Sequence, residues 1–307
     1  MRLSRYCGLV LLSVLVSVCV TAAAAGSGRA LTDSQARLAF ARGVSPDRYE
    51  IWTASGRGQG LRRVTHGCGW DWWPAWSPDR TQLAFARSCG SRFAIYIVNA
   101  NGGGLHRLVK TSSDDVWPSW SPDGSEVAFV AGSTGRTELY VIGANGKGLH
   151  RLTHNGVDDA SPAWSPDGSL ILFSSGRTHH RLTTIPAEGG TPHALPLRGG
   201  EPAWSPDGTR IVWAKGIAGA ARETADLWIA NADGSGARRL THEQVGVVSH
   251  HPSWSPDGRT IAYMSNRGAP SKGAALWTIS PTGGTPHRIT SPGYEDADPT
   301  WQPAASG

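Results

Sequence analysis

One short motif recurs through the chain and constrains its fold more than any other feature. Trp-Ser-Pro-Asp occurs five times in the 307 residues, beginning at Trp76, Trp120, Trp164, Trp204 and Trp254. The tryptophans are spaced by 44, 44, 40 and 50 residues, and a degenerate sixth copy follows after 47 more, at Trp301-Gln302-Pro303. Such a period is typical of architectures that copy one supersecondary unit along the chain.

Each motif is followed by the same series of short apolar segments. In one unit these are RIVWAK (210–215), ADLWIA (225–230), a Gly-rich turn at 231–236 and ARRLTH (237–242). Branched and aromatic residues favour strands, whereas the 39 Gly and 20 Pro weaken helices. Together with the Trp segment this makes four short strands in about 45 residues, which predicts a blade of a β-propeller.

The ends of the repeat region predict how the ring closes. RLAFAR at 37–42 has no Trp motif before it, so the region begins at the second strand of a unit. The last copy, around Trp301, supplies only a first strand. We therefore predict an all-β fold over 37–303, a six-bladed β-propeller of four-stranded blades. We expect the C-terminal innermost strand to pair with the N-terminal blade, which leaves no open edge.

A Ser two residues before an Asp could also indicate catalysis. Pro sets φ at the second position of a turn, Asp is favoured beside it, and Gly permits positive φ at its end. Because a catalytic Ser is not needed five times, the motif is predicted to be the turn between the first and second strands. The sequence contains no HExxH, phosphate-binding Gly-Lys-Thr/Ser or GxSxG motif, so we do not predict an enzyme.

The repeat PAWSPDG…RIVWA…DLWIANADGSGARRLTH resembles the WD-like propeller repeats of the TolB family, over roughly residues 36–303. The resemblance implies a six-bladed propeller outside the cytoplasm that usually acts by binding proteins. TolB proteins also carry an N-terminal α/β domain, which residues 27–36 are too few to form. We therefore carry over the fold and the exported binding role, without the N-terminal domain and without a particular partner.

The N-terminal segment has the pattern of a secretory signal. Arg2 and Arg5 precede an apolar run from Leu9 to Val20, and small residues follow up to Gly26. This predicts a signal peptide over 1–25 and a short linker over 26–36, with a retained anchor as the alternative. We expect export to the periplasm or the extracellular space, and no membrane span once the signal is removed.

Two cysteines, Cys68 and Cys89, lie beyond the predicted signal. Cys68 precedes a Trp motif, and Cys89 lies between the second and third strands of the same unit. Alternating strand direction places both kinds of loop on one face of a propeller, so the two residues can meet. Because exported proteins meet oxidising conditions, we predict a disulfide between them.

The net charge argues against a nucleic-acid partner. The chain carries a formal charge of +5, which the loss of Arg2 and Arg5 would lower by two. The remaining basic residues are spread along the sequence rather than clustered, as is usual where charge serves solubility.

Carboxylates recur in the loops that lead to the innermost strands, beside the central channel. Four of these loops carry an aspartate three residues before the proline: Asp71, Asp115, Asp159 and Asp296. Gathered at the channel mouth, they would suit a hard cation such as Ca²⁺ or a basic partner segment. The alternative is that each aspartate accepts hydrogen bonds from amides of its own loop.

Aromatic residues occupy the same loops. Trp70, Trp72 and Trp73 fall in one loop and Trp117 in the next, where they could hold a sugar ring or a peptide. Packing between blades is the alternative. His250 and His251 occupy an equivalent loop, either as an additional metal ligand or as an ordinary surface pair.

These observations favour a non-enzymatic binding module that uses the loops around the channel. We expect a protein partner or an envelope component, with a saccharide or peptide ligand as a further option. The alternatives are a metal-assisted enzyme similar to polysaccharide lyases and a cation sensor. No cofactor is predicted, with Ca²⁺ as the one candidate ion.

Overall fold

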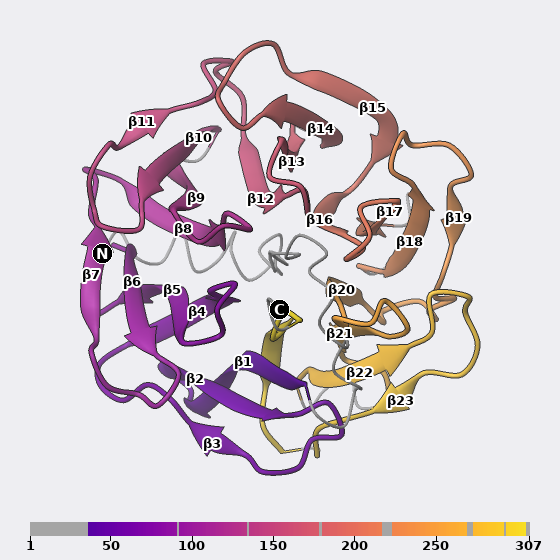
Figure 1. Ribbon diagram of the computed structural model, residues 1–307. Coiled ribbons are helices and arrows are strands. Elements are labelled where there is room, and N and C mark those ends of the chain that lie inside the picture. Colours follow the sequence, from indigo (N-terminus) through magenta and orange to yellow (C-terminus); the bar gives the residue numbers. More distant parts are fainter. Residues whose placement is uncertain are drawn as a thin grey trace.

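The computed structural model describes residues 36–90, 92–133, 135–177, 180–216, 223–268, 273–291 and 293–304. Within these ranges the chain forms 24 β-strands and no helix, which confirms the all-β prediction. The sheets are arranged around a central axis as a β-propeller, with one strand of each set of four nearest the axis (Figure 1). The predicted signal peptide and all but the last residue of the linker lie outside the described residues.

Four sheets have four strands each, and their strands follow the chain order. They are β8 (Asp114–Trp120), β9 (Glu126–Ser133), β10 (Arg136–Gly143) and β11 (His150–Arg151); β12 (Asp159–Trp164), β13 (Leu170–Ser175), β14 (Arg181–Pro186) and β15 (His193–Arg198); β16 (Gly200–Trp204), β17 (Arg210–Gly216), β18 (Ala225–Asn231) and β19 (Arg238–Arg239); β20 (Ser249–Trp254), β21 (Ile261–Ser265), β22 (Ala275–Ile279) and β23 (His287–Arg288).

A fifth sheet has eight strands, in two sets of four. One set is β24 (Asp296–Trp301), β1 (Arg37–Ser45), β2 (Arg48–Ser55) and β3 (Arg62–Arg63); the other is β4 (Trp70–Trp76), β5 (Gln82–Ser88), β6 (Ala94–Asn99) and β7 (His106–Val109). A single parallel bridge, between Tyr49 and Trp70, joins the sets. Each set has the antiparallel order of the four-stranded sheets.

The tryptophan of every repeat is buried between sheets, which explains why the motif recurs. Trp76, Trp254 and Trp301 are at most 2% exposed. The indole N–H of Trp164 donates to the Ser119 carbonyl of the preceding sheet at 3.2 Å, and that of Trp204 to Ala163 at 3.3 Å. Burial of a large ring at each seam holds a sheet against its neighbour, and at these two seams the indole N–H adds a hydrogen bond.

The Ser-Pro-Asp segment forms the predicted turn. In one copy the Ser165 hydroxyl donates to Asp167 at 2.6 Å, and the Gly168 amide donates to the Ser165 carbonyl at 2.9 Å. Gly168 has a φ of 74°, and Arg80, which replaces this glycine in the first copy, has a φ of 66°. The five serines are therefore structural.

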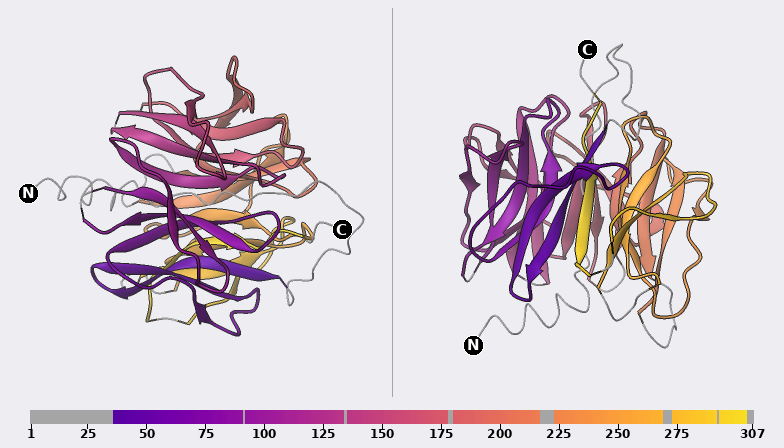
Figure 2. Two further views of the ribbon diagram at one scale, coloured as in Figure 1. Left: turned by 60° about the vertical axis from the view of Figure 1, so that its left-hand side comes forward. Right: turned by 90° about the horizontal axis from the view of Figure 1, so that it is seen from below.

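The predicted closure of the ring is also confirmed. β24 pairs antiparallel with β1, in a register that places Trp301 opposite Leu38 and Asp296 opposite Arg42. Figure 2 shows the yellow β24 beside the indigo β1, although they come from opposite ends of the described chain. Both ends of the repeat region are thereby held in one sheet.

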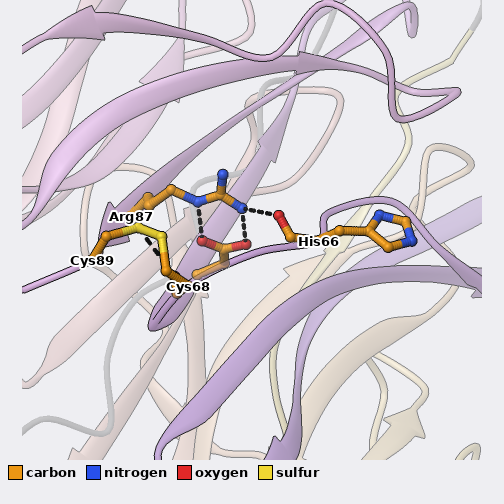
Figure 3. Close-up of a disulfide and its surroundings, with 5 residues drawn as sticks. His66, Cys68, Arg87 and Cys89 are labelled. Carbon is orange, nitrogen blue, oxygen red and sulfur yellow. Dashed lines mark hydrogen bonds and ion pairs between the residues drawn. A yellow bond between two sulfur atoms is a disulfide. The ribbon is translucent and has the colours of Figure 1, made fainter.

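The predicted disulfide joins Cys68, in the loop before β4, to Cys89, which follows β5 (Figure 3). The two residues are 21 positions apart, and their Cα atoms are separated by 5.1 Å. The bond ties together two loops on the face from which the innermost strands begin.

Candidate functional site

The innermost strands share a bulge at the same repeat position. The pairing of β4 with β5 skips from Trp72 to Ala75, and that of β20 with β21 skips from His250 to Ser253; the other innermost strands shift likewise. The residue before the proline in each bulge has a φ of 53–62°: Trp73, Trp117, Ser161, Glu201, His251 and Asp298. We call these six residues the pre-proline ring.

This backbone conformation is costly and must be imposed by the sheet. Few non-glycine residues adopt positive φ, and a following proline normally favours an extended conformation. A bulge bends its strand and redirects a side chain, and such bulges often lie beside functional sites. The repetition of the bulge indicates that the propeller itself requires it, while the identity of each side chain differs from strand to strand.

Members of the pre-proline ring contact one another across sheets. The rings of Trp73 and Trp117 lie 5.5 Å apart between centroids. The Trp73 amide donates to Asp298 Oδ2 at 3.3 Å, and His251 Nδ1 lies 3.0 Å from Asp298 Oδ1. These residues come from β4, β8, β20 and β24, so the bulges bring distant segments together where the innermost strands converge (Figure 1).

One side of the ring is charged. The Glu201 carboxylate lies 3.0 Å from His250 Nδ1 and accepts a hydrogen bond from the His251 amide at 2.9 Å. His251 Nε2 is 3.9 Å from Glu201, so this histidine lies between two carboxylates. His251 is 0% exposed and Asp298 1% exposed, which makes this a buried network of histidines and carboxylates rather than an open ligand site.

The network changes the acidity of its members. Burial raises the pKa of Glu201, but the charges of His250 and His251 outweigh it, and the net pKa lies below its ordinary value. Burial lowers the pKa of His250, but the Glu201 carboxylate outweighs it, and the net pKa is raised. Burial raises the pKa of Asp298, which His251 opposes only in part. The Glu201–His250 pair is thus stabilised in its charged form.

The other side of the ring is aromatic, and the predicted tryptophans do come together there. Tyr49 stacks on Trp72 with centroids 4.2 Å apart and meets the edge of Trp70 at 6.3 Å. Trp72 lies 6.1 Å from Trp73, which in turn contacts Trp117. We call the set Tyr49, Trp70, Trp72, Trp73 and Trp117 the aromatic cluster.

The aromatic cluster serves packing and remains partly exposed. Trp72 packs against three separate hydrophobic clusters, and Trp73 is 6% exposed, so the expectation of packing between sheets holds for these two. Trp70, Tyr49 and Trp117 are half-buried. The indole N–H of Trp70 donates to the Asp47 carbonyl at 2.6 Å, which fixes its orientation.

Two of the four predicted aspartates form buried ion pairs with arginines. Asp71 accepts two hydrogen bonds from Arg87, at 2.6 and 2.7 Å, and Asp296 accepts two from Arg42, at 2.6 and 2.8 Å. All four side chains are at most 6% exposed. The arginines end the equivalent segments RLAFAR and QLAFAR, and each lies directly opposite its aspartate on the adjacent strand.

The other two aspartates are held by short polar side chains. Asp115 accepts hydrogen bonds from the Thr111 amide and hydroxyl at 2.8 and 2.6 Å, as expected for an aspartate that serves its own loop. Asp159 is bound by Asn155 and by the Ser175 hydroxyl, at 2.9 and 2.6 Å. Over the described ranges, no group of three or more His, Cys, Asp or Glu side chains is placed to hold a metal ion.

The expectation of an ordinary surface pair at His250 and His251 is wrong. His251 is fully buried and the side chain of His250 is 13% exposed, because the bulge turns them toward Glu201 and Asp298. Ser161, Glu201 and Asp298 also lie in these bulges, although none of them was predicted as a site residue. The repeat could have indicated them, since each of the three residues immediately precedes the proline of its unit, as Trp73 and Trp117 do.

Comparisons with known proteins agree with this fold. The family model of the Tricorn protease N-terminal beta propeller domain matches residues 95–224. TolB from Acinetobacter baumannii is 23% identical, with a TM-score of 0.75 over 89% of this chain and 68% of that one. A putative TolB from Agrobacterium tumefaciens is 19% identical, with a TM-score of 0.62 over 83% and 89% of the two chains.

A more distant solved structure is an oligogalacturonate lyase in complex with manganese, 15% identical, with a TM-score of 0.52 over 86% of this chain and 74% of that one. No curated protein gives a significant sequence match. At these identities the likeness shows a TolB-like β-propeller fold and nothing finer. Nowhere in the described ranges does the chain form a helix of the length and apolar character needed to cross a membrane.

Proposed function

We propose that this chain is an exported, non-enzymatic β-propeller of six blades that binds a protein partner around its channel mouth. The blade count treats the two sets of strands in the eight-stranded sheet as separate blades, since in the described part of the chain a single bridge, between Tyr49 and Trp70, joins them. The binding surface is the exposed part of the aromatic cluster, with the loops that lead into β4 and β8.

The observation that carries this proposal is a group of half-buried aromatic rings at the mouth of a rigid scaffold. Trp70, Tyr49 and Trp117 keep part of their surface in water, while Trp72 and Trp73 beneath them are anchored by packing. Tryptophan and tyrosine are enriched at the centres of protein interfaces, because they bury a large area at little cost in side-chain entropy. A pre-organised aromatic surface of this kind favours binding without rearrangement.

The charged side of the pre-proline ring supports a structural role. Glu201 accepts a hydrogen bond from the His251 amide, and the buried His251 ring lies 3.0 Å from Asp298, so these contacts link the innermost strands on which the aromatic cluster stands. Hydrogen-bonded groups of this sort hold a site in place rather than react. Export is supported by the Cys68–Cys89 disulfide, which is stable in oxidising compartments, and by the predicted signal peptide.

A pull-down from the envelope fraction, followed by titration of the captured protein in purified form, tests the proposal. Trp70→Ala and Trp117→Ala should each weaken binding at least about tenfold, as expected for interface anchors. Trp277→Ala is the matched control, because Trp277 is a half-buried tryptophan on β22 of another sheet. Equal affinity of all three variants would contradict the proposal. Saturable stabilisation by Ca²⁺ or Mn²⁺ would favour the metal-dependent alternatives instead.

A further inference from the structure

A pocket lies apart from the channel mouth, between the sheet of β8 to β11 and the sheet of β12 to β15. It has a volume of about 450 Å³ and is lined by the end of β9, by β10 and β11, and by loops that adjoin β12 and β13. Its volume falls within the range of small-molecule sites, roughly 300–1,000 Å³. The charged residues that line it are Arg136, Arg151, Arg177 and Glu138.

The charges of this pocket are unbalanced. Glu138 is 4% exposed and is already engaged by Arg151 at 2.7 Å and by the Gly156 amide at 3.0 Å. Arg151 therefore belongs to a structural ion pair with a buried glutamate, and a similar pair occurs in the eight-stranded sheet between Glu50 and Arg63. Arg136 and Arg177 have no carboxylate opposite them among the lining residues, and both are exposed.

Arg177 is held at the rim of the pocket. Its guanidinium donates to the Gly156 carbonyl at 3.3 Å. Gly156 and Arg177 stand at the repeat positions of Cys68 and Cys89, since Asp159 aligns with Asp71 and Ser175 with Arg87. In the eight-stranded sheet a disulfide joins these two loops, whereas in the sheet of β12 to β15 a hydrogen bond from Arg177 joins them. The other N–H groups of Arg177 can donate to a ligand.

We propose that this pocket binds a small anionic ligand of about the size of a sugar acid or sugar phosphate. Guanidinium groups bind carboxylate and phosphate oxygens through paired, charge-assisted hydrogen bonds. Tyr140 is half-buried in the wall of the pocket and supplies a flat apolar surface suited to a sugar ring. The site is separate from the aromatic cluster and does not depend on the function proposed for it.

Isothermal titration with four probes tests this assignment: galacturonate, glucose 6-phosphate, and the neutral sugars galactose and glucose. We expect saturable binding of at least one of the two acids and none of the neutral sugars. Which acid binds distinguishes a carboxylate ligand from a phosphate ligand. Affinity should fall with added NaCl, because the contacts are between charges near the surface.

Substitutions of the two exposed arginines test whether any binding occurs at this pocket. Arg136→Gln and Arg177→Gln should each weaken the binding of that acid at least about tenfold, because each removes a charge-assisted contact. Arg48→Gln is the matched control, since Arg48 occupies the repeat position of Arg136 in the eight-stranded sheet, and it should leave affinity unchanged. Unaltered thermal unfolding would show that the variants remain folded. The assignment is overturned if neither acid binds, if the neutral sugars bind equally well, or if both pocket variants bind as the unaltered protein does.

Discussion

The Arg42 guanidinium donates two hydrogen bonds to the Asp296 carboxylate, and the two residues are 254 positions apart in the sequence. Asp71 and Arg87 form the same buried pair within a single hairpin, 16 positions apart. The same ion pair thus occurs twice, once between strands that are close in sequence and once between the strands that close the ring. The Asp71–Arg87 pair can therefore serve as the control when the effect of the Asp296–Arg42 pair on ring closure is measured.

Asp296→Asn should lower the free energy of unfolding by about 3 kcal/mol, because it leaves the buried Arg42 charge without its partner. Asp71→Asn should cost a similar amount, measured by urea denaturation. Hydrogen exchange separates the two variants. Amides of β24 and β1 should exchange faster in Asp296→Asn, whereas those of β4 and β5 should do so in Asp71→Asn. Unchanged protection of β24 in the first variant would show that the pair does not hold the closure.

The Cys68–Cys89 disulfide should stabilise the propeller by restricting the unfolded chain. For a loop of this length the expected contribution is about 3 kcal/mol, so the double variant Cys68→Ala/Cys89→Ala should unfold at lower urea concentration. Dithiothreitol should shift the unaltered protein to the midpoint of the variant and leave the variant itself unchanged. A midpoint that does not respond to reduction would argue against this contribution.

Gly69→Ala should be among the most destabilising single changes near the site. Gly69 has a φ of 75°, and a Cβ atom there would lie 1.8 Å from the Ser88 carbonyl oxygen, so we expect a loss of about 3 kcal/mol or more. Gly60→Ala is the control, because Gly60 has a φ of 62° but nothing within 4 Å of the added atom. Its cost should be about 1 kcal/mol, from the backbone conformation alone. Equal thermal shifts in the two variants would show that the contact is relieved by movement.

The Glu201–His250 pair should make stability depend on pH. Because the pKa of His250 is raised, its contribution is complete below the ordinary value of about 6.5 and is lost as pH rises through the raised pKa. Because the pKa of Glu201 is lowered, its contribution is present above about 4.3 and is lost as pH falls through the lowered pKa. The pair therefore stabilises most between about pH 4.3 and 6.5.

His250→Gln should accordingly lower the melting temperature more at pH 6 than at pH 9, as followed by circular dichroism. His287→Gln, at an exposed histidine of β23, is the control, and its effect should not vary in this way. Glu201 and Glu223 are the carboxylates whose charges act on His250, so Glu201→Gln should remove most of the pH dependence. An equal loss of melting temperature in His250→Gln at both pH values would contradict a contribution from the charged Glu201–His250 pair.

The sequence was sufficient to predict the features that depend on local periodicity. The Trp motif, the Ser-Pro-Asp turn, the order of strands, the closure by β24 and the disulfide all follow from the repeat and its phase. The partner of Asp71 could also have been predicted, since only the segments that end in Arg87 and Arg42 carry an arginine at that repeat position, and both units carry the aspartate. Comparing the residues that lie opposite each other on the first and second strands of each unit would have predicted the Asp71–Arg87 pair.

The pre-proline ring was not predictable in the same way. A proline normally keeps the preceding residue extended, and only the pairing of the innermost strand with its neighbour produces the bulge. The burial of His251 depends on Glu201 and Asp298, which approach it from two other strands. Contacts among three separate strands carry no local signature, so a histidine pair in a loop resembles a surface pair until the sheets are assembled.

The pairing of β1 with β24 has a consequence for biosynthesis. Among the described residues, β1 is the first strand to be synthesised and its innermost neighbour, β24, is the last, so this set of four strands stays incomplete until β24 has been made. The nascent chain must hold β1 and β2 with one edge unpaired while the intervening units are synthesised. Closure of the ring at this set therefore has to wait for the synthesis of β24, whereas the sheets between them contain strands that are made earlier.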